Sequence, residues 1–208
     1  MKDKDDLLDI KITLVGDSGV GKTSIIGRFV TGIFISDTNS SSGLSYSQKE
    51  LEKNKKQIRL NLWDTVGQEK YRALGKNFYK DSFLILIVYD ISNRQSFENI
   101  KNIWYPDINE NGEKIKHISI VGNKIDKYEE EEVKEEEARS YAKEIDADFF
   151  LVSANKGKGI EEMFDSLVDK YFEEEFMNKV DESREERVDS IFLHQKSMSQ
   201  SKSFNTCC

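Results

Sequence analysis

The sequence predicts a doubly wound α/β fold, with a mostly parallel sheet covered by helices on both faces. Short apolar runs typical of strands alternate with segments whose apolar residues recur at helical spacing. One run, at 83–89, is apolar throughout, as expected for a parallel strand buried on both faces. Ligands of such sheets bind beyond the carboxyl ends of the strands, so we expect the chemistry in the loops at that edge.

The expected elements follow one another in a regular order. Strand patterns occur at 10–15, 58–63, 83–89, 118–121 and 149–152. Three helical stripes are formed by Ile25, Ile26, Phe29 and Val30, by Phe97, Ile100, Trp104 and Ile108, and by Val133, Ala138, Tyr141, Ala142 and Ile145. The most regular stripe, from Ile160 to Phe172, predicts the last helix. The pattern ends near Met177, which predicts a domain at 1–176 and a flexible tail at 177–208.

Composition excludes several classes of protein. The 208 residues carry 31 Lys and Arg against 39 Asp and Glu, a net charge of −8, so no basic field favours nucleic acid as a partner. The N-terminus lacks the apolar region of a signal peptide, and no stretch approaches the roughly 18 apolar residues of a membrane span. The only cysteines are Cys207 and Cys208, which leaves none for a disulfide framework and suits a cytosolic protein.

A glycine-rich segment separates the first strand from the first helix. It matches the pattern G-x-x-x-x-G-K-[ST] and reads Gly16-Asp17-Ser18-Gly19-Val20-Gly21-Lys22-Thr23. Its backbone N–H groups and the helix N-terminus are expected to surround phosphate oxygens. Lys22 is expected to reach the β- and γ-phosphates, and the Thr23 hydroxyl to bind Mg²⁺. The strand–loop–helix context predicts a nucleotide site without naming the nucleotide.

Two further motifs follow in order. Asp64 ends the half-buried strand, where a carboxylate can hold the hydration shell of Mg²⁺; taken alone, it would more often cap a strand end. Asn123-Lys124-Ile125-Asp126 follows a later strand. The Asp126 carboxylate can accept from the N1–H and the 2-amino group of guanine, and adenine lacks that donor pair, so the motif predicts selection against ATP. Taken alone, this motif is common in surface loops.

These segments together resemble the ordered signature of the Ras superfamily of small GTPases. The resemblance covers roughly residues 8–175 and rests on GDSGVGKT, WDTVGQE, NKID and Ser153-Ala154-Asn155. Within it, RLNLWDTVGQEKY, VYDISNRQSF and the terminal Cys-Cys resemble the Rab branch. The resemblance implies a P-loop NTPase G domain whose mostly parallel sheet contains one antiparallel strand.

The resemblance also implies roles for individual residues. Mg²⁺ would be held by Thr23, Asp64 and Ser41, and catalysis would depend on Lys22 and on Gln68, which orients the attacking water. The implied nucleotide-binding residues are Gly16, Asp17, Ser18, Gly19, Val20, Gly21, Lys22, Thr23, Ser24, Phe34, Ser41, Gly67, Asn123, Lys124, Asp126, Ser153, Ala154 and Asn155. Phe34 would pack on the base, Ala154 would add a backbone contact to guanine, and Gly67 would donate to the γ-phosphate.

Two positions in the switch segments depart from the family pattern. Ser41 stands where the family has a threonine, eighteen residues after Thr23. It keeps the hydroxyl but loses the methyl that restrains it, which predicts a looser first switch. Val66 stands where the family has alanine. We expect its bulk beside Gly67 to slow intrinsic hydrolysis, unless local repacking absorbs the two extra methyl groups.

An exposed aromatic on the half-buried strand predicts a partner surface. Ile58, Leu60 and Leu62 alternate inward, so Trp63 points to the other face. A neighbouring helix or loop could cover it, or it could contact a partner. In Rabs an aromatic trio in the switch region binds effectors, and Tyr46, Trp63 and Phe78 match it.

The tail is expected to carry a lipid anchor. It holds five basic and five acidic residues, so electrostatics alone will not hold it on a membrane. By resemblance, Cys207 and Cys208 would each receive a geranylgeranyl chain, and two chains give stable anchoring; the alternative is a pair of unmodified thiols. The protein would then cycle between the cytoplasm and the cytosolic face of an intracellular membrane. In the cytoplasm a GDP-dissociation inhibitor or prenylation escort would cover the lipid chains.

The function expected from the resemblance is a Rab-like switch in vesicle traffic. It would bind GTP or GDP with Mg²⁺, hydrolyse GTP slowly without an activating protein, and respond to an exchange factor while recruiting effector proteins. The alternatives are a GTP-binding scaffold that hardly turns over and, less in keeping with Asp126, an ATP-consuming P-loop enzyme.

Two stretches of the sequence are each dominated by one polar residue type. Ser36–Ser47 contains six serines and is expected to be a flexible loop. Glu129–Glu137 contains seven glutamates in nine positions, which favours a solvated helix start or loop over an acidic docking patch.

Overall fold

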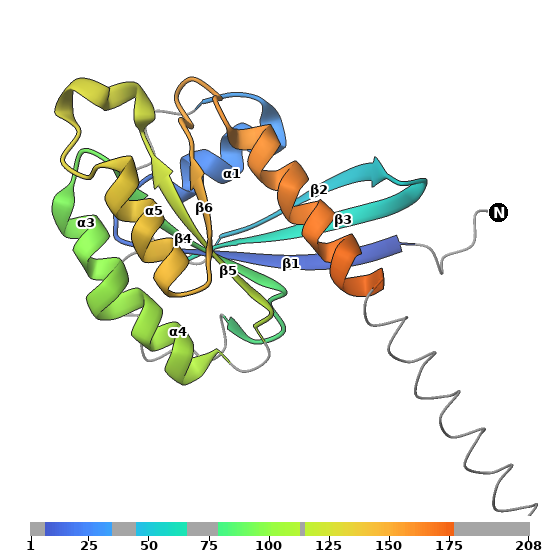
Figure 1. The fold of residues 1–208 in the computed structure, drawn as a ribbon. Helices are drawn as coiled ribbons and strands as arrows, with labels where there is room; N and C mark the ends of the chain where they lie inside the picture. Colours follow the sequence, from blue (N-terminus) through green and yellow to red (C-terminus); the bar gives the residue numbers. More distant parts are fainter. Residues whose placement is uncertain (1–6, 35–44, 66–78, 113–114, 177–208) are drawn as a thin grey trace, which may run out of the picture. The chain divides into compact units, whose positions relative to one another are not determined.

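The computed structural model describes residues 7–34, 45–65, 79–112 and 115–176. The chain divides into two compact units, Met1–Glu161 and Glu162–Cys208. The first unit contains a six-stranded sheet with helices against it (Figure 1). In the second unit, residues 162–176 are helical, in agreement with the regular stripe in the sequence. The boundary predicted between 176 and 177 stays a prediction.

The sheet confirms the predicted fold class. Its strands are β1 (Leu7–Val15), β2 (Ser45–Lys53), β3 (Lys56–Asp64), β4 (Leu84–Asp90), β5 (His117–Asn123) and β6 (Asp148–Leu151). Their order is β2-β3-β1-β4-β5-β6; all neighbours are parallel except β2, which is antiparallel to β3. The carboxyl ends of the five parallel strands therefore meet at one edge, and the predicted motifs follow there.

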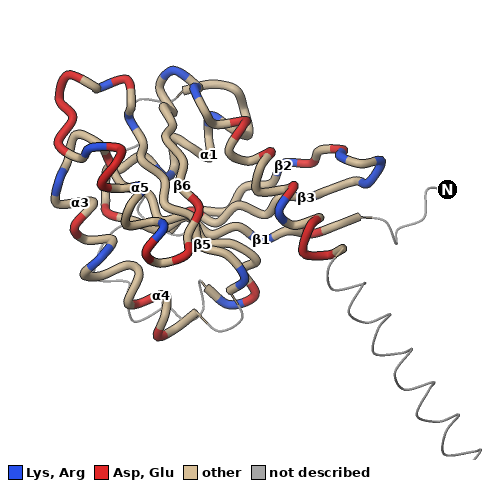
Figure 2. The backbone as a smooth tube through the Cα atoms, viewed as in Figure 1, with Lys and Arg blue, Asp and Glu red and all other residues tan. Residues whose placement is uncertain are grey.

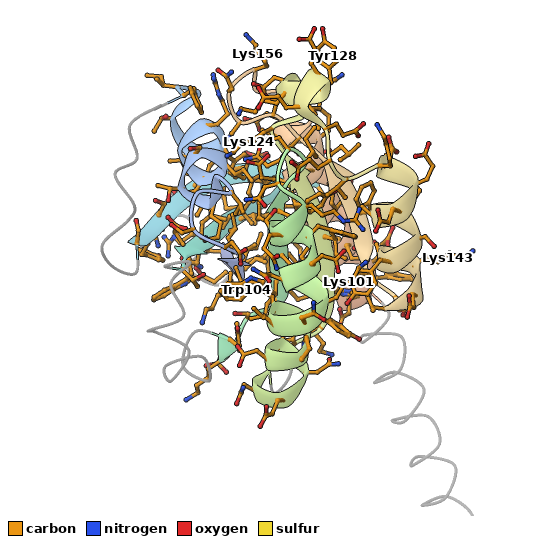
Figure 3. All side chains as sticks on the ribbon, turned by 90° about the vertical axis from the view of Figure 1, so that its left-hand side faces the viewer. Lys101, Trp104, Lys124, Tyr128, Lys143 and Lys156 are labelled. Atoms are coloured by element: carbon orange, nitrogen blue, oxygen red, sulfur yellow. The ribbon has the colours of Figure 1, made fainter. Side chains whose placement is uncertain are left out.

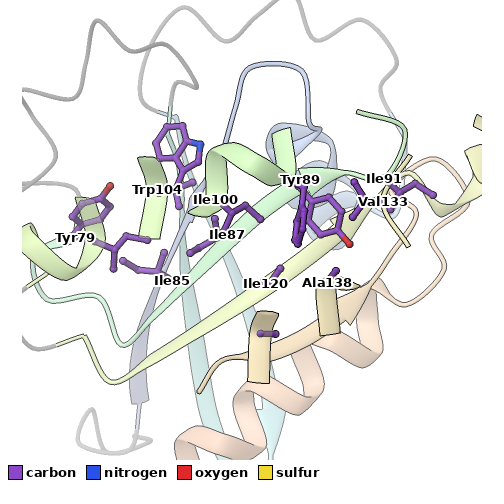
Figure 4. Close-up of a cluster of buried hydrophobic side chains, with 14 residues drawn as sticks. Tyr79, Ile85, Ile87, Tyr89, Ile91, Ile100, Trp104, Ile120, Val133 and Ala138 are labelled. Carbon is purple, nitrogen blue, oxygen red and sulfur yellow. The ribbon is translucent and has the colours of Figure 1, made fainter. Parts of the chain in front are cut away.

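Helices cover both faces of the sheet (Figures 1 and 3). They are α1 (Lys22–Thr31), α3 (Arg94–Asn99), α4 (Tyr105–Asn111) and α5 (Glu135–Glu144). All seven residues of β4 are buried, as its continuous apolar run predicts. A cluster of apolar side chains between β4, β5, α3 and α5 fills one face (Figure 4). On the other face α1 buries Ile25, Ile26 and Phe29.

One predicted helix is interrupted. The apolar stripe from Phe97 to Ile108 is buried as expected, but its backbone comprises α3, a π-helical turn η3 (Ile100–Trp104) and α4. The N–H of Tyr105 donates to the carbonyl of Ile100, five residues back. Pro106 follows at once, and a proline ring clashes with the carbonyl four residues before it. A widened turn there relieves that clash.

The sequence pattern failed to predict β2. Residues 45–47, assigned above to a flexible polar loop, instead begin this strand; residues 36–44 of that loop lie outside the described part of the chain. The strand is an edge of the sheet and none of its residues is fully buried. It therefore lacks the apolar alternation by which strands are found.

The acidic stretch has the solvated conformation expected of it. Glu129 and Glu130 end a 3-10 segment, η4 (Ile125–Glu130), and Glu135–Glu137 form the first turn of α5, where negative charge is favourable. Figure 2 marks these acidic positions in red along the segment that leads into α5 and at the start of that helix. Among the described residues, no helix combines the length and the hydropathy that crossing a bilayer requires.

Candidate nucleotide-binding site

The predicted motifs lie together at the carboxyl edge of the sheet. The P-loop, residues 16–23, joins β1 to α1, Asp64 ends β3, and Asn123 ends β5. Residues 153–155 follow β6, and the Ala154 N–H donates to Asn123 Oδ1 at 3.2 Å. All of these residues belong to the first unit, so one rigid sheet positions both the P-loop and the guanine motif.

Two glycines of the P-loop are required by close approach and by backbone conformation. Gly16 has φ 135°, and a Cβ there would collide with the carbonyl of Val88 on β4. Gly21 has φ 100°, and its Cβ would collide with the side-chain amide of Asn123. Side chains are disfavoured at such φ values. The loop can therefore lie against β4 and β5 only with glycine at these positions.

Side chains of α1 and of residues 123–124 bind the carbonyls of the P-loop. Lys22 Nζ donates to the carbonyls of Gly16 at 2.7 Å and Asp17 at 2.8 Å. Asn123 Nδ2 donates to Val20 at 2.8 Å, and Lys124 Nζ donates to Gly19 at 2.7 Å. Since the N–H of a peptide group points opposite its C=O, these contacts leave amides of the loop for an anion on the other side.

Lys22 is poised to bind a negatively charged group. Its side chain is buried, and burial lowers its pKa to about 8, although the carboxylates of Asp64 and Asp17 raise it in part. A buried ammonium group is unfavourable when the negative charge around it does not fully balance the loss of its hydration. A phosphate oxygen beside Nζ would supply the missing negative charge.

Thr23 and Asp64 fit a divalent cation. The Thr23 hydroxyl donates to Asp64 Oδ2, while the buried Oδ1 has no hydrogen-bond partner among the described residues. Burial raises the pKa of Asp64, and Thr23 and Lys22 oppose the shift. An orphaned carboxylate oxygen beside a hydroxyl is the hard oxygen donor set that Mg²⁺ prefers. The third predicted ligand, Ser41, lies outside the described residues.

Asp126 is held as an ionised acceptor. It accepts from Ser153 Oγ at 2.5 Å and from Asn155 Nδ2 at 2.8 Å. Partial burial would raise its pKa, but the bonds from Ser153 and Asn155 outweigh that effect and lower it. Each carboxylate oxygen has a second lone pair, so Asp126 can still accept from two donors of a base.

Lys124 connects the guanine motif to two other elements. Its backbone is left-handed, with φ 66°, and its Nζ bridges the carbonyl of Gly19 and Asp90 Oδ2, which lies 2.7 Å away at the end of β4 (Figure 3). The lysine therefore has a structural task in addition to any contact with nucleotide.

Arg28 of α1 also contacts the site, although no pattern in the sequence predicted it. Its Nε donates to the carbonyl of Ala154 at 2.8 Å and its Nη2 to that of Asn155 at 2.6 Å. The guanidinium also lies 5.9 Å from the ring centre of Phe34, the residue expected to pack on the base. An arginine on the polar side of an amphipathic helix gives no signal of such a contact in a single sequence.

The aromatic surface is described only in part. The rings of Tyr46 and Trp63 lie 5.1 Å apart, and Trp63 points away from Ile58 and Leu60, as predicted. With Lys11 and Asn61 they line a shallow pocket of about 360 Å³. The other predicted functional residues lie outside the described part of the chain, namely Val66, Gly67, Gln68, Phe78, Cys207 and Cys208.

Comparison with known proteins identifies relatives of this chain. The Ras family model matches residues 11–173. Ras-related protein Rab-26 of Rattus norvegicus is 37% identical over 158 residues, covering 76% of this chain and 61% of that protein. Rab-22A of Homo sapiens is 37% identical and covers 76% and 81%. RABC2a of Arabidopsis thaliana is 33% identical over 204 residues and covers 97% and 94%. The chain thus spans about three-fifths of the length of Rab-26.

We predict that Arg28→Lys weakens guanine-nucleotide binding. Lysine keeps the charge but cannot span both carbonyls with a planar fork, so the loop at 153–155 loses a tether. Loss of one bond to a charged donor corresponds to about a tenfold higher dissociation constant for GDP, measured by calorimetry. The matched control is Arg139→Lys, which alters an exposed pair with Glu135. Equal affinities for both variants would contradict the assignment.

Proposed function

Since the chain belongs to the Ras family, and within it to the Rab branch, we propose that it is a guanine-nucleotide-dependent switch. It binds GTP or GDP with Mg²⁺ and hydrolyses GTP. Two features of the site together support the proposal. The carbonyls of the P-loop are bound by Lys22, Asn123 and Lys124, and Asp126 of the same guanine motif is held as an ionised acceptor.

Residues of the P-loop and of β3 have different roles in binding the phosphates and Mg²⁺. Lys22 and the loop amides would hold the β- and γ-phosphates, and Thr23 and Asp64 would hold Mg²⁺, whose positive charge would supply electrostatic stabilisation of the phosphates. By family resemblance Gln68 orients the attacking water, Gly67 donates to the γ-phosphate, and Ser41 completes the Mg²⁺ site. Catalysis in this class depends on positioning, with an arginine from an activating protein supplying much of the rate.

The proposed cellular role is regulation of membrane traffic. In the GTP state Tyr46, Trp63 and Phe78 contact an effector, and the exposed ring of Tyr46 beside Trp63 supports this surface. Cys207 and Cys208 carry prenyl chains that hold the protein on the cytosolic face of an intracellular membrane. An exchange factor, an activating protein and a GDP-dissociation inhibitor complete the cycle.

A slowly hydrolysing GTP-binding scaffold is the second candidate. Val66 and Ser41, which depart from the family pattern, favour it. Hydrolysis with and without cell extract separates the two. Acceleration by extract is the result for a switch, and a low rate unchanged by extract is the result for a scaffold.

Base selectivity provides the direct test of nucleotide identity. Competition against fluorescent GDP should require about 10⁴-fold more ATP than GTP, because adenine leaves the Asp126 carboxylate unpaired. Asp126→Asn should remove most of the preference for guanine. The control is Glu130→Gln, which neutralises an exposed carboxylate of the same loop. ATP competing as well as GTP with the wild-type protein would refute a guanine switch.

Val66→Ala is predicted to accelerate intrinsic hydrolysis severalfold. The smaller side chain frees the backbone beside Gly67, which must approach the γ-phosphate. Single-turnover hydrolysis of protein preloaded with GTP measures the rate without interference from product release. An alanine variant that is equal to or slower than wild type would show that Val66 does not restrain the reaction.

The lipid anchor is tested by localisation. A tagged chain should be found on an intracellular membrane, and the double variant Cys207→Ser/Cys208→Ser should be dispersed in the cytosol, because the tail has no net basic charge to hold it. An unchanged distribution of the double variant would remove prenylation from the proposal.

A further inference from the structure

Two side chains beyond the nucleotide motifs bind the carboxylate of Asp17 in the P-loop. Asn99 Nδ2 donates to Asp17 Oδ2 at 2.6 Å, and Trp104 Nε1 donates to Asp17 Oδ1 at 2.8 Å. Each carboxylate oxygen therefore has a donor of its own. Hydrogen bonds to an ionised acceptor are roughly twice as strong as neutral ones, so this pair of contacts is a firm link between the P-loop and the helical stretch after β4.

The π-helical turn is what brings both donors to one side. In a regular α-helix, side chains five positions apart point about 140° away from each other. Between Asn99 and Trp104 the backbone is widened, and the Tyr105 N–H bonds to Ile100 instead of to the carbonyl four residues back. Turns of this kind occur often at functional sites. Here the wider turn lets Asn99 and Trp104 meet the same carboxylate.

The donors are themselves held in place. Trp104 is only 7% exposed and belongs to the apolar cluster of Figure 4, and Asn99 Oδ1 accepts from Gln95 at 2.8 Å. Arg94 binds Glu137 of α5 through two nitrogens, at 2.5 and 2.6 Å. Lys101 lies over the rings of Phe97 and Tyr141, away from Trp104 (Figure 3). Asp17 is therefore bound to side chains that are themselves fixed by packing and by hydrogen bonds.

The link matters for nucleotide because of where Asp17 lies. Its backbone carbonyl accepts from Lys22 Nζ, so a shift of Asp17 moves a partner of the phosphate-binding lysine. Its carboxylate is also a negative charge within the loop that surrounds phosphate. Two like charges at short range repel strongly where water is excluded. Asn99 and Trp104 hold that charge toward the helix.

We propose that Asn99 and Trp104 are positioning residues for nucleotide retention. They fix the position of Asp17, so that the P-loop keeps its phosphate-binding conformation. The Asp17 carboxylate then stays turned away from the phosphates. This inference rests on the proposed function only in taking the bound ligand to be a guanine nucleotide.

The first test removes one donor and keeps the packing. Trp104→Phe leaves an aromatic ring in the cluster but lacks the indole N–H. We expect fluorescent GDP to dissociate about tenfold faster, as the loss of one charge-assisted bond predicts. The control is Tyr105→Phe, which removes a hydroxyl from the next residue and keeps its ring. Dissociation from Trp104→Phe at the wild-type rate would overturn the proposal for this residue.

The second test reverses the polarity of the other donor. Asn99→Asp places a carboxylate against Asp17 with almost no change in shape, and should accelerate GDP release more than Trp104→Phe does. Asn102→Asp adds the same charge at an exposed position of the same turn and should release GDP at the wild-type rate. Equal effects of the two aspartates would mean that only the net charge of the helix matters.

An NMR measurement separates positioning from a general loss of stability. In protein labelled with ¹⁵N, the indole resonance assigned by its loss in Trp104→Phe should shift in Asn99→Asp and between the GDP and GTP-analogue states. Urea unfolding of the same samples gives the stability. Lower stability with an unmoved resonance and normal GDP release would refute positioning. Failure of the wild-type protein to bind fluorescent GDP would instead refute the proposed function.

Discussion

The carbonyls of the P-loop must be satisfied from one side if its amides are to bind phosphate from the other. Lys22, Asn123 and Lys124 provide those donors, for the carbonyls of Gly16, Asp17, Val20 and Gly19. Leaving a buried carbonyl without a donor destabilises the fold by more than an average hydrogen bond stabilises it. This conformation of the loop therefore depends on the sheet order, in which β4 alone separates the end of β1 from the end of β5.

The same donors join recognition of the base to recognition of the phosphates. Asn123 donates to Val20 and accepts from Ala154, so one side chain ties the P-loop to the loop that supports Asp126. Lys124 reaches both Gly19 and Asp90, and Arg28 carries the connection back from residues 154 and 155 to α1. Replacing a residue of the guanine motif consequently disturbs the phosphate loop as well.

The buried elements could be predicted from the sequence because burial imposes periodicity. The run that became β4 and the inward alternation of Ile58, Leu60 and Leu62 are examples. The polar strand β2 escaped prediction because an edge strand buries no complete face. The contacts that Arg28, Asn99 and Trp104 make with the site depend on how elements far apart in the sequence pack together. Those of Asn99 and Trp104 also depend on a π-helical turn, which the spacing of apolar residues does not predict. The roles assigned to Gln68 and Ser41 rest on family resemblance alone.

Strand β2 also determines where the sheet ends. It carries side chains of both charges, namely Lys49, Glu50, Glu52 and Lys53, and Arg59 of β3 pairs with Glu50. Unpaired backbone at a sheet edge invites a strand from another molecule, and charged side chains on the edge oppose that pairing. Copies crowded together thus have a built-in resistance to joining edge to edge into aggregates.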